Sequence, residues 1–447
     1  MTHDRPKTAR AVAAHVLYRV AVDSAFASVA LDAELERARL DPRDAALATE
    51  ITYGTLRALS DIDVLLAKQL SRPGQEVEPH IQAILRTGAY QILHLERVPV
   101  HAAVDESVNL AHLVRGKNLA GLVNAVLRKV AAHRPAVPHP PHALAMPDWL
   151  TQLLRDSLGE ERARSFSDLR SLPVPLGIRV QTQSIARDAF ASKLAAFAPQ
   201  AKIELGTLST RSLLVRSGSD PRKWPGYAEG EFAVQDEGSL AIAELVGAKV
   251  GERVLDACAG RGGKTMVLAE AVGASGHVTA TDMYPGKLEK MLPECARLKL
   301  DADRIELVGL DFSVGTGGLD ANFDRVLVDA PCTGLGTIHR RPEILLRLGP
   351  ADALRMQATQ LQILQRAASL VRPGGVLVYS VCSPANAEGA DVVALFLESA
   401  ADFRLLPNQL ARPGLTPDSD GILRLGPFQH AELGPDAYQV AAFQRLP

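Results

Sequence analysis

The spacing of hydrophobic residues divides the chain into a helical front part and an alternating rear part. Between residues 6 and 132, apolar residues recur at helical spacing, most regularly over 9–22 and 81–95. The glycine-punctuated, β-branched runs that characterise strands are absent from this stretch. The pattern therefore predicts an all-α domain over residues 1–132.

Prolines mark the end of this helical region. Five of them occur within residues 133–147, namely Pro135, Pro138, Pro140, Pro141 and Pro147. Because proline cannot continue a helix and favours extended backbone, we predict a linker here. The same stretch contains His133, His139 and His142, but no cysteine or carboxylate stands nearby at ligand spacing, so no metal site is expected.

Residues 148–235 show a mixed pattern. Strand-like runs at 176–180 and 212–216 flank a helical run at 185–195. This order favours a small α/β module of the ferredoxin-like or RRM-like type, placed ahead of the last domain.

From residue 236 to residue 447, strand and helix patterns alternate clearly. Strands are predicted at 253–256, 278–281, 305–308, 326–329, 376–379 and 438–443, with helices between them, for example at 264–271, 286–298 and 354–371. Short strands joined by helical crossovers predict a doubly wound, mostly parallel sheet. Its functional site is expected at the carboxyl ends of the strands.

Composition changes this picture little. The 447 residues are 47% hydrophobic and 22% charged, which suits two or three globular domains. No apolar run reaches the roughly 18 residues of a membrane span, and no signal peptide is apparent, so we expect a cytoplasmic protein without membrane association. Four cysteines do not make a disulfide framework. The net charge of −2 means that any RNA-binding surface must come from local clusters.

A glycine-rich turn follows the first strand of the last domain, where Gly260-Arg261-Gly262-Gly263 comes after Val254-Leu255-Asp256. Glycines let a ligand approach the backbone, and a helix N-terminus offers unpaired N–H groups. Asp282 ends the next strand, where an acid can accept ribose hydroxyls, and Asp311 follows the strand after that and can receive an adenine amino group. Either acid alone would indicate a turn or cap. The ordered set favours a nucleotide cofactor, with NAD as the alternative, although the third spaced glycine of dinucleotide loops is missing.

Two of the four cysteines each follow a strand. Cys332 stands in Asp-Ala-Pro-Cys-Thr-Gly (329–334) and Cys382 in Val-Tyr-Ser-Val-Cys-Ser (378–383). Both lead into turns whose backbone N–H groups can favour a thiolate. Cys258 and Cys295 lack this context and are expected to serve packing.

Methylation of a pyrimidine at C5 is a chemistry that needs two thiols on neighbouring strand ends. Cytosine C5 is too weak a nucleophile to attack a sulfonium methyl group, but addition of a thiolate at C6 turns the ring into an enamine that can. Asp329 is placed to steady the charge that develops at the N3 edge. A base must then remove the C5 proton, and the target base must leave its stack to reach the pocket.

The C-terminal half resembles the RNA 5-methylcytosine methyltransferases of the Nop2/Sun type. The resemblance rests on Gln-Asp-Glu-Gly-Ser at 235–239, the glycine-rich loop at 258–265, the acids Asp282 and Asp311, and the two cysteine motifs. It implies a Rossmann-like class I methyltransferase domain with a seven-stranded, mostly parallel sheet. In this family pattern Cys382 would be the attacking nucleophile and Cys332 would assist release of the methylated product.

The same resemblance implies S-adenosylmethionine as cofactor. Lys264 and Asp329 would contact the flipped cytosine or the reactive end of the cofactor. The expected cofactor residues are Cys258, Ala259, Gly260, Arg261, Gly262, Gly263, Lys264, Asp282, Asp311 and Asp329.

Residues 1–132 resemble NusB-type helical RNA-binding domains. The similarity rests on Ile-Leu-Arg-Thr-Gly-Ala-Tyr-Gln-Ile-Leu at 84–93, Val-Asp-Glu-Ser-Val-Asn-Leu-Ala at 104–111 and Leu-Val-Asn-Ala-Val-Leu at 122–127. The whole layout is similar to the bacterial small-subunit rRNA cytosine-5 methyltransferase B subfamily. It implies 16S rRNA as the substrate, and we expect a monomer. A tRNA cytosine methyltransferase and a non-catalytic RNA-binding assembly factor are the alternatives.

RNA contacts are expected from local basic clusters. His339-Arg340-Arg341 follows the Cys332 turn and is predicted to bind phosphate beside the flipped base. A second cluster, comprising Arg115, Lys117, Arg128 and Lys129, is either an RNA contact or a solvated face.

Four positions depart from the family pattern. Gly260-Arg261 stands where Ala-Pro is usual, Val381 replaces the threonine before the second cysteine, and Glu388-Gly389 replaces Glu-Asn. None of these changes removes a catalytic atom.

Overall fold

The computed structural model describes residues 7–70, 72, 74, 76–138, 146–167, 174–216, 219–428 and 436–447. His139 and His142 of the predicted linker lie outside them. The chain forms two compact units. A helical unit comprises Met1–Thr151, Ser167–Leu172 and Ile338–Gly349, and an α/β unit comprises the rest. The short segment Ile338–Gly349 therefore belongs to the helical unit, although it is flanked on both sides by chain of the α/β unit.

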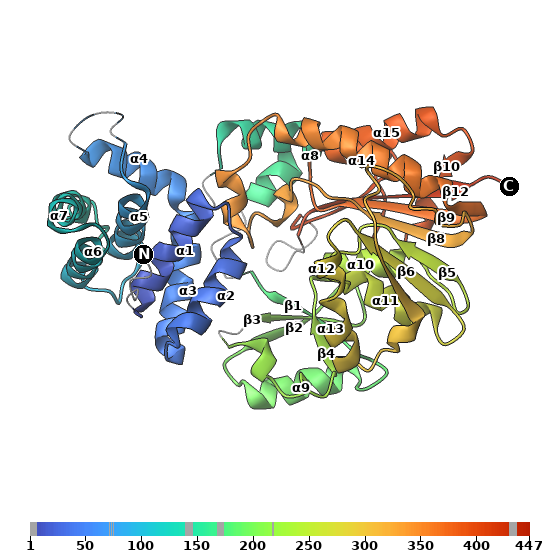
Figure 1. Cartoon of the computed structure of the whole chain (residues 1–447), viewed down its shortest axis with the longest axis horizontal. Helices are drawn as coiled ribbons and strands as arrows, with labels where there is room; N and C mark the ends of the chain where they lie inside the picture. Colours follow the sequence, from blue (N-terminus) through green and yellow to red (C-terminus); the bar gives the residue numbers. More distant parts are fainter. Residues whose placement is uncertain are drawn as a thin grey trace. The chain divides into compact units, whose positions relative to one another are not determined.

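The helical unit is built from helices, some of which begin at a residue whose side chain caps them. They are α1 (Ala9–Val22), α2 (Ala27–Ala38), α3 (Pro42–Arg57), α4 (Leu59–Gln69), α5 (Pro79–His94), α6 (Val100–Arg115), α7 (Lys117–Ala131) and the 3₁₀ helix η4 (Pro342–Leu346) (Figure 1). Asp41 accepts a hydrogen bond from the Asp44 amide and Glu78 accepts one from the Ile81 amide, each just before a proline in the first turn. These residues satisfy donors that a helix N-terminus leaves free. Helix α5 packs against α1, α3, α4, α6 and α7, so it forms the centre of this unit.

Segment η4 secures the start of α2 within the helical unit. Glu343, which is almost fully buried, accepts a hydrogen bond from the Ala27 amide at 3.1 Å. Arg347 donates to the Ala25 carbonyl oxygen and lies over the Phe26 ring, 5.0 Å from its centroid. These contacts replace the side-chain cap that α2 lacks.

The α/β unit contains a small antiparallel sheet. Its strands are β1 (Leu176–Val180), β2 (Lys202–Leu205), β3 (Ser212–Arg216) and β4 (Phe232–Val234), in the order β2-β3-β1-β4. Helix α9 (Arg187–Phe197) joins β1 to β2 and buries Phe190 and Leu194 against the sheet. The 3₁₀ turn η1 (Pro221–Lys223) stands in the β3–β4 connection. The arrangement confirms a small α/β module of ferredoxin-like strand order.

The main sheet follows the predicted alternation. It contains β5 (Arg253–Asp256), β6 (His277–Asp282), β7 (Ile305–Gly309), β8 (Phe323–Asp329), β9 (Val371–Val381), β10 (Phe403–Leu405), β11 (Leu423–Leu425) and β12 (Tyr438–Arg445). The order is β10-β12-β9-β8-β5-β6-β7, with β11 paired to β12. Strands β5 to β9 pair in parallel, and β10, β11 and β12 pair antiparallel. The Rossmann-like class is thus confirmed, and the short β11 makes an eighth strand beyond the expected seven.

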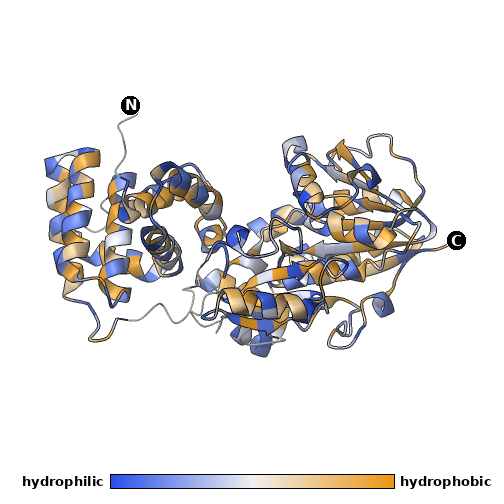
Figure 2. Ribbon diagram, turned by 90° about the horizontal axis from the view of Figure 1, so that it is seen from below, coloured by the Kyte–Doolittle hydropathy of each residue, from blue (hydrophilic) through white to orange (hydrophobic). Residues whose placement is uncertain are grey.

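Helices cover the main sheet. They include α10 (Glu237–Leu245), α11 (Gly263–Val272), α12 (Pro285–Leu288), α13 (Met291–Arg297), α14 (Asp352–Ser369) and α15 (Ala390–Ser399), and α8 (Asp148–Ser167), which is interrupted at Gly159, precedes the small sheet along the chain. Hydrophobic and hydrophilic residues alternate along them, as in helices with one buried face (Figure 2). None of the helices in the described part of the chain is long and apolar enough to cross a membrane.

The prediction of one helix over 286–298 is wrong. The chain forms α12 and α13 instead, with a break at residues 289–290. Pro293 explains the break, because it has no N–H to donate to the Glu289 carbonyl and its ring would clash there in a continuous helix. The predicted helix over 354–371 ends at Ser369, and Val371 already begins strand β9.

Replacing Gly54 by alanine is predicted to destabilise the helical unit. An added Cβ would lie 2.0 Å from the Tyr90 ring where α3 crosses α5. Such overpacking typically costs about 1–3 kcal/mol. Hydrogen exchange of α3 and α5 peptides should accelerate, while peptides of the α/β unit should be unaffected.

Gly121→Ala is the matched control. This glycine lies in α7 with nothing within 4 Å of an added Cβ. The same change should therefore stabilise the helix by up to about 1 kcal/mol. Equal protection in both variants would contradict the close packing of Gly54 on Tyr90.

Candidate active site

Parallel pairing brings the polar ends of several strands to one edge of the main sheet. Asp256, Asp282 and Asp329 end β5, β6 and β8, and Cys382 follows β9 directly. Strands β6, β5, β8 and β9 are consecutive neighbours in the sheet. The predicted residues therefore gather at the carboxyl edge, where doubly wound sheets bind their ligands.

The glycine-rich loop after β5 has the backbone that its sequence suggests. Gly260 and Gly262 have φ angles of 58° and 82°, in the left-handed region that favours glycine. A Cβ on Gly262 would also lie 2.4 Å from the Met291 side chain, whereas the space around Gly260 is open. Gly262 immediately precedes α11, so the loop presents a helix N-terminus. The Arg261 side chain is exposed.

Two acids follow the neighbouring strands. Asp282, which is 8% exposed, accepts hydrogen bonds from the Gly260 amide at 3.2 Å and the Tyr284 amide at 2.8 Å. It also pairs with Lys287, so the structure joins Asp282 to the glycine loop. Asp311 follows β7 and accepts a hydrogen bond from the Ser313 amide at 2.8 Å. That contact is a local turn, which was the alternative interpretation of this residue.

Lys264 and Asp329 form an ion pair beside the loop. Lys264 Nζ lies 2.7 Å from Asp329 Oδ2, and Ser380 Oγ donates to Asp329 Oδ1 at 2.7 Å. Burial opposes the ammonium charge, but the adjacent Asp329 carboxylate outweighs it and raises the pKa of Lys264. The ammonium group and the hydroxyl together fix the orientation of the carboxylate.

Asp256 is the most deeply buried acid of this edge, at 1% exposure. Thr265 Oγ1 donates to its Oδ2 at 2.7 Å, whereas Oδ1 has no hydrogen-bond partner among the described residues. Burial, reinforced by the negative charge of Asp329, raises the pKa of Asp256 to about 6.

The two cysteines that follow strands meet. Cys332 Sγ and Cys382 Sγ are 3.2 Å apart, and both remain free thiols. The hydrogen bond with Cys382 is the main cause that raises the pKa of Cys332, and burial adds to it. Cys332 therefore tends to keep its proton. The turn after Cys332 is hydrogen-bonded to the backbone of Cys382, because the Gly336 amide donates to the Cys382 carbonyl at 3.0 Å.

Glu388 is a residue of this site to which the sequence pattern assigned no role. It is fully buried and accepts hydrogen bonds from Thr333 and Ser383, the residues that directly follow the two cysteines. Gln360 of α14, also fully buried, donates to Glu388 at 3.2 Å and to the Pro331 carbonyl at 3.0 Å. Its sequence signal was the first position of the family's Glu-Asn pair, which appears here as Glu388-Gly389.

The remaining predicted residues lie beside the glycine loop, on α13 and in the helical unit. Cys295 is buried on α13, and Cys258 is half-buried beside the loop, where burial raises its pKa. His339, Arg340 and Arg341 belong to the helical unit; the first two are half-buried and Arg341 is exposed. Within the described residues, no group of three or more His, Cys, Asp and Glu side chains is arranged to hold a metal ion.

Comparison with known proteins identifies the family. A model described as "16S rRNA methyltransferase RsmB/F" matches residues 243–444, and a "NusB family" model matches residues 7–132. The "Probable ribosomal RNA small subunit methyltransferase B" of Bacillus subtilis (strain 168) is 31% identical, over 88% of this chain and 89% of its own length. The chain belongs to the RsmB-type methyltransferase family.

Further members of the RsmB-type family match equally broadly. The "Ribosomal RNA small subunit methyltransferase B" of Pseudomonas putida is 31% identical, over 89% of this chain and 90% of its own length. A solved methyltransferase homologue from Pyrococcus horikoshii has a TM-score of 0.56 and 25% identity, over 68% of this chain and 96% of its own. These relatives confirm the expected family, with its NusB-type region and Rossmann-like methyltransferase fold.

The buried Asp256 predicts a pH-dependent stability of the α/β unit. Because its folded pKa of about 6 exceeds the usual value of 3.8, the stabilising contribution is complete below about pH 4. It is lost as the pH rises through 6, at a cost of roughly 3 kcal/mol. Asp256→Asn should remove this component. Hydrogen exchange of β5 peptides at pH 4 and 7 would measure it, and an unchanged difference in the variant would contradict the buried ionisation.

Proposed function

We propose that this chain transfers a methyl group from S-adenosylmethionine to C5 of a cytosine in 16S rRNA, through a covalent adduct with Cys382. The observation that carries the proposal is the pair of thiols 3.2 Å apart at the carboxyl edge of the sheet. The glycine loop and the Lys264–Asp329 pair lie at the same edge. Curated relatives named ribosomal RNA small subunit methyltransferase B support rRNA as the substrate.

The residues of the loop fit the proposed cofactor. Gly260 leaves open space at the mouth of the loop, α11 presents its N-terminus, and Asp282 lies within hydrogen-bond distance of the loop backbone. These groups suit the ribose and the amino acid portion of S-adenosylmethionine. Asp282 would accept ribose hydroxyls, and Asp311 would receive the adenine amino group. The cofactor supplies an electrophilic methyl group on a sulfonium centre.

The side chains at the sheet edge divide the proposed chemistry. Cys382 Sγ forms the bond to cytosine C6, the role that the family resemblance implies for it, and Cys332 Sγ lies 3.2 Å away. Asp329, held by Lys264 and Ser380, acts here in its protonated form as the donor to ring N3, because the ring takes up the negative charge of the thiolate. After methylation the C5 proton leaves to a base, the bond between C6 and sulfur breaks, and its electron pair returns to Cys382. Cys332 assists this release.

RNA binding is proposed to involve the helical unit. Its NusB-type region and the basic residues His339, Arg340 and Arg341 supply groups that can contact phosphate. A tRNA substrate is the alternative within the same chemistry. Bisulfite sequencing of 16S rRNA and tRNA from a strain lacking the gene distinguishes the two substrates. The cytosine that loses its methyl group in this strain lies in only one of the two RNAs.

Substitutions of the two cysteines are predicted to block different steps of the reaction. Cys382→Ala should abolish methyl transfer, because no thiolate attacks C6, and should leave cofactor affinity unchanged. Cys332→Ala should form the adduct but release it slowly, so that a protein–RNA complex resistant to denaturation accumulates. Transfer of labelled methyl groups and gel electrophoresis under denaturing conditions measure the two effects. Normal methylation by Cys382→Ala would refute the assignment of the nucleophile.

A further inference from the structure

We propose that Glu388 is the positioning residue that holds Cys332 and Cys382 in register, so that the covalent adduct is released. This inference rests on the proposed function, since it concerns one step of that reaction. Glu388 contacts neither sulfur atom directly. Its effect would be exerted through the residue that follows each cysteine.

One carboxylate joins the two cysteine turns. Glu388 Oε1 accepts from the Thr333 amide at 2.8 Å, and Oε2 accepts from Thr333 Oγ1 and Ser383 Oγ, each at 2.5 Å. Gln360 Nε2 supplies a fourth donor at 3.2 Å. Thr333 follows Cys332 and Ser383 follows Cys382. A buried carboxylate with this many donors is held firmly, because losing any of them leaves charge unsatisfied.

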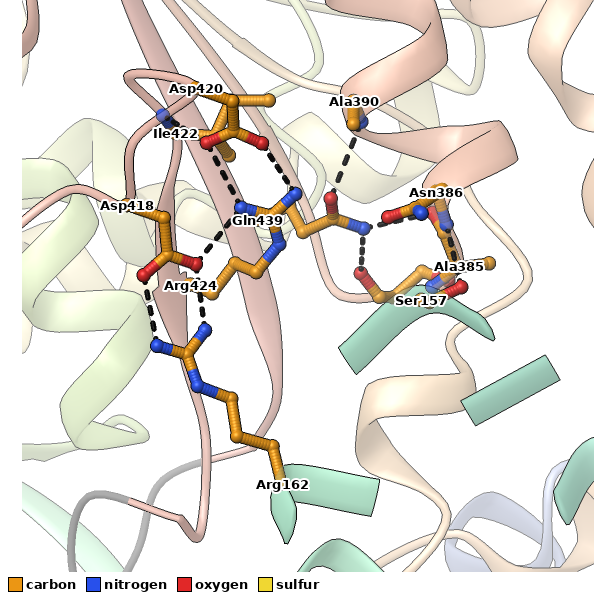
Figure 3. Close-up of polar contacts among 11 residues, drawn as sticks. Ser157, Arg162, Ala385, Asn386, Ala390, Asp418, Asp420, Ile422, Arg424 and Gln439 are labelled. Atoms are coloured by element: carbon orange, nitrogen blue, oxygen red, sulfur yellow. Dashed lines mark hydrogen bonds and ion pairs between the residues drawn. The ribbon is translucent and has the colours of Figure 1, made fainter. Parts of the chain in front are cut away.

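The turn that carries Glu388 is itself anchored (Figure 3). Gln439 of β12, which is 1% exposed, donates to the Ser383 carbonyl at 3.1 Å and the Ala385 carbonyl at 2.8 Å. Its Oε1 accepts from the Ala390 amide at 3.3 Å. Gln439 thus forms hydrogen bonds with the turn on both sides of Glu388. Its strand, β12, is a direct neighbour of β9.

Helix α8 supports the same turn from another direction. Ser157 Oγ accepts a hydrogen bond from the Asn386 amide at 3.1 Å. Beyond Gly159, where α8 is interrupted, Arg162 pairs with Asp418 at 2.6 Å, and Arg424 also donates to Asp418 (Figure 3). The carboxylate of Glu388 is therefore mounted on a segment fixed by both a strand and a helix.

The attack on C6 and the release of the adduct depend to different degrees on the position of Glu388. Attack on C6 needs Cys382 alone, whereas release also needs Cys332 in place beside the adduct. Without the carboxylate, the Thr333 turn and the Ser383 turn lose their common anchor, and the separation of the sulfurs is no longer fixed. Misplacement of about 1 Å can slow a step roughly hundredfold. Release should therefore suffer more than attack.

The test compares Glu388→Ala with Glu388→Gln in the full-length protein, using a 16S rRNA transcript and S-adenosylmethionine. Glu388→Ala should accumulate the denaturation-resistant adduct with both cysteines intact, and its turnover should fall by roughly tenfold to hundredfold. The Michaelis constant for the cofactor should stay unchanged. Glu388→Gln should restore much of the turnover, because the amide can accept from Thr333 N–H and donate to the two hydroxyls.

Glu237→Ala is the matched control. Glu237 is also a buried carboxylate, and it accepts from the Leu208 amide at 2.6 Å and Ser212 Oγ at 2.7 Å. Its loss should lower stability without accumulating adduct. The proposal is overturned if Glu388→Ala shows no more adduct than the wild type, or if Glu237→Ala accumulates as much.

A thiol assay tests the positioning without RNA. Diamide converts the Cys332 and Cys382 thiols to a disulfide and is itself reduced to the hydrazine. Peptide mapping should show rapid pairing in the wild type and in Glu237→Ala, and pairing slowed severalfold in Glu388→Ala. Equal rates in all three proteins would refute the positioning role. Failure of the proposed function would show differently, as a wild type that pairs its thiols normally but neither methylates 16S rRNA nor yields an adduct with Cys332→Ala.

Discussion

The parallel pairing of β8 with β9 is the constraint on which the rest of the site depends. It places Asp329 opposite Ser380, and the Ala330 amide extends the pairing by donating to the Ser380 carbonyl at 2.9 Å. The two thiols stand just beyond this last pair. Residues 326–328 of β8 are fully buried, with Val326 and Val328 in the core on one face and Leu327 in the core on the other, so a slip by one residue would exchange the residues of the two cores. Hydrophobic packing in the sheet thus brings the two cysteine turns to one edge, where Glu388 joins them.

Charge at this edge is tolerated because almost every group has a partner. Asp329 has Lys264 and Ser380, and Glu388 has donors from three side chains and one backbone amide. Asp256 is the exception, with one carboxylate oxygen unsatisfied and a raised pKa. A buried group of this kind costs stability. Such costs are typical of functional sites, where the arrangement is selected for chemistry rather than for stability.

The sequence was sufficient for elements with a repeating signal and for residues at their ends. Six strands of the main sheet have an apolar run long enough to detect, whereas β10 and β11 have only three residues each. The cysteines and acids were predicted together because parallel strands end at a common edge. Glu388, Gln360 and Gln439 come from a turn, a helix and a distant strand. No periodicity marks a single buried polar residue, so only the three-dimensional structure shows that the three belong to one network.

The departures from the family pattern acquire a physical explanation from this network. Val381 packs in the core on the face of the sheet that Cys332 also contacts, and Cys382 contacts the core on the other face. Arg261 is exposed, so its charge is solvated. Gly389 is different, because a Cβ there would lie 2.2 Å from the Gln439 side chain. An asparagine at this position would displace the glutamine that grips the turn. The missing side chain of Gly389 therefore leaves the space that Gln439 occupies.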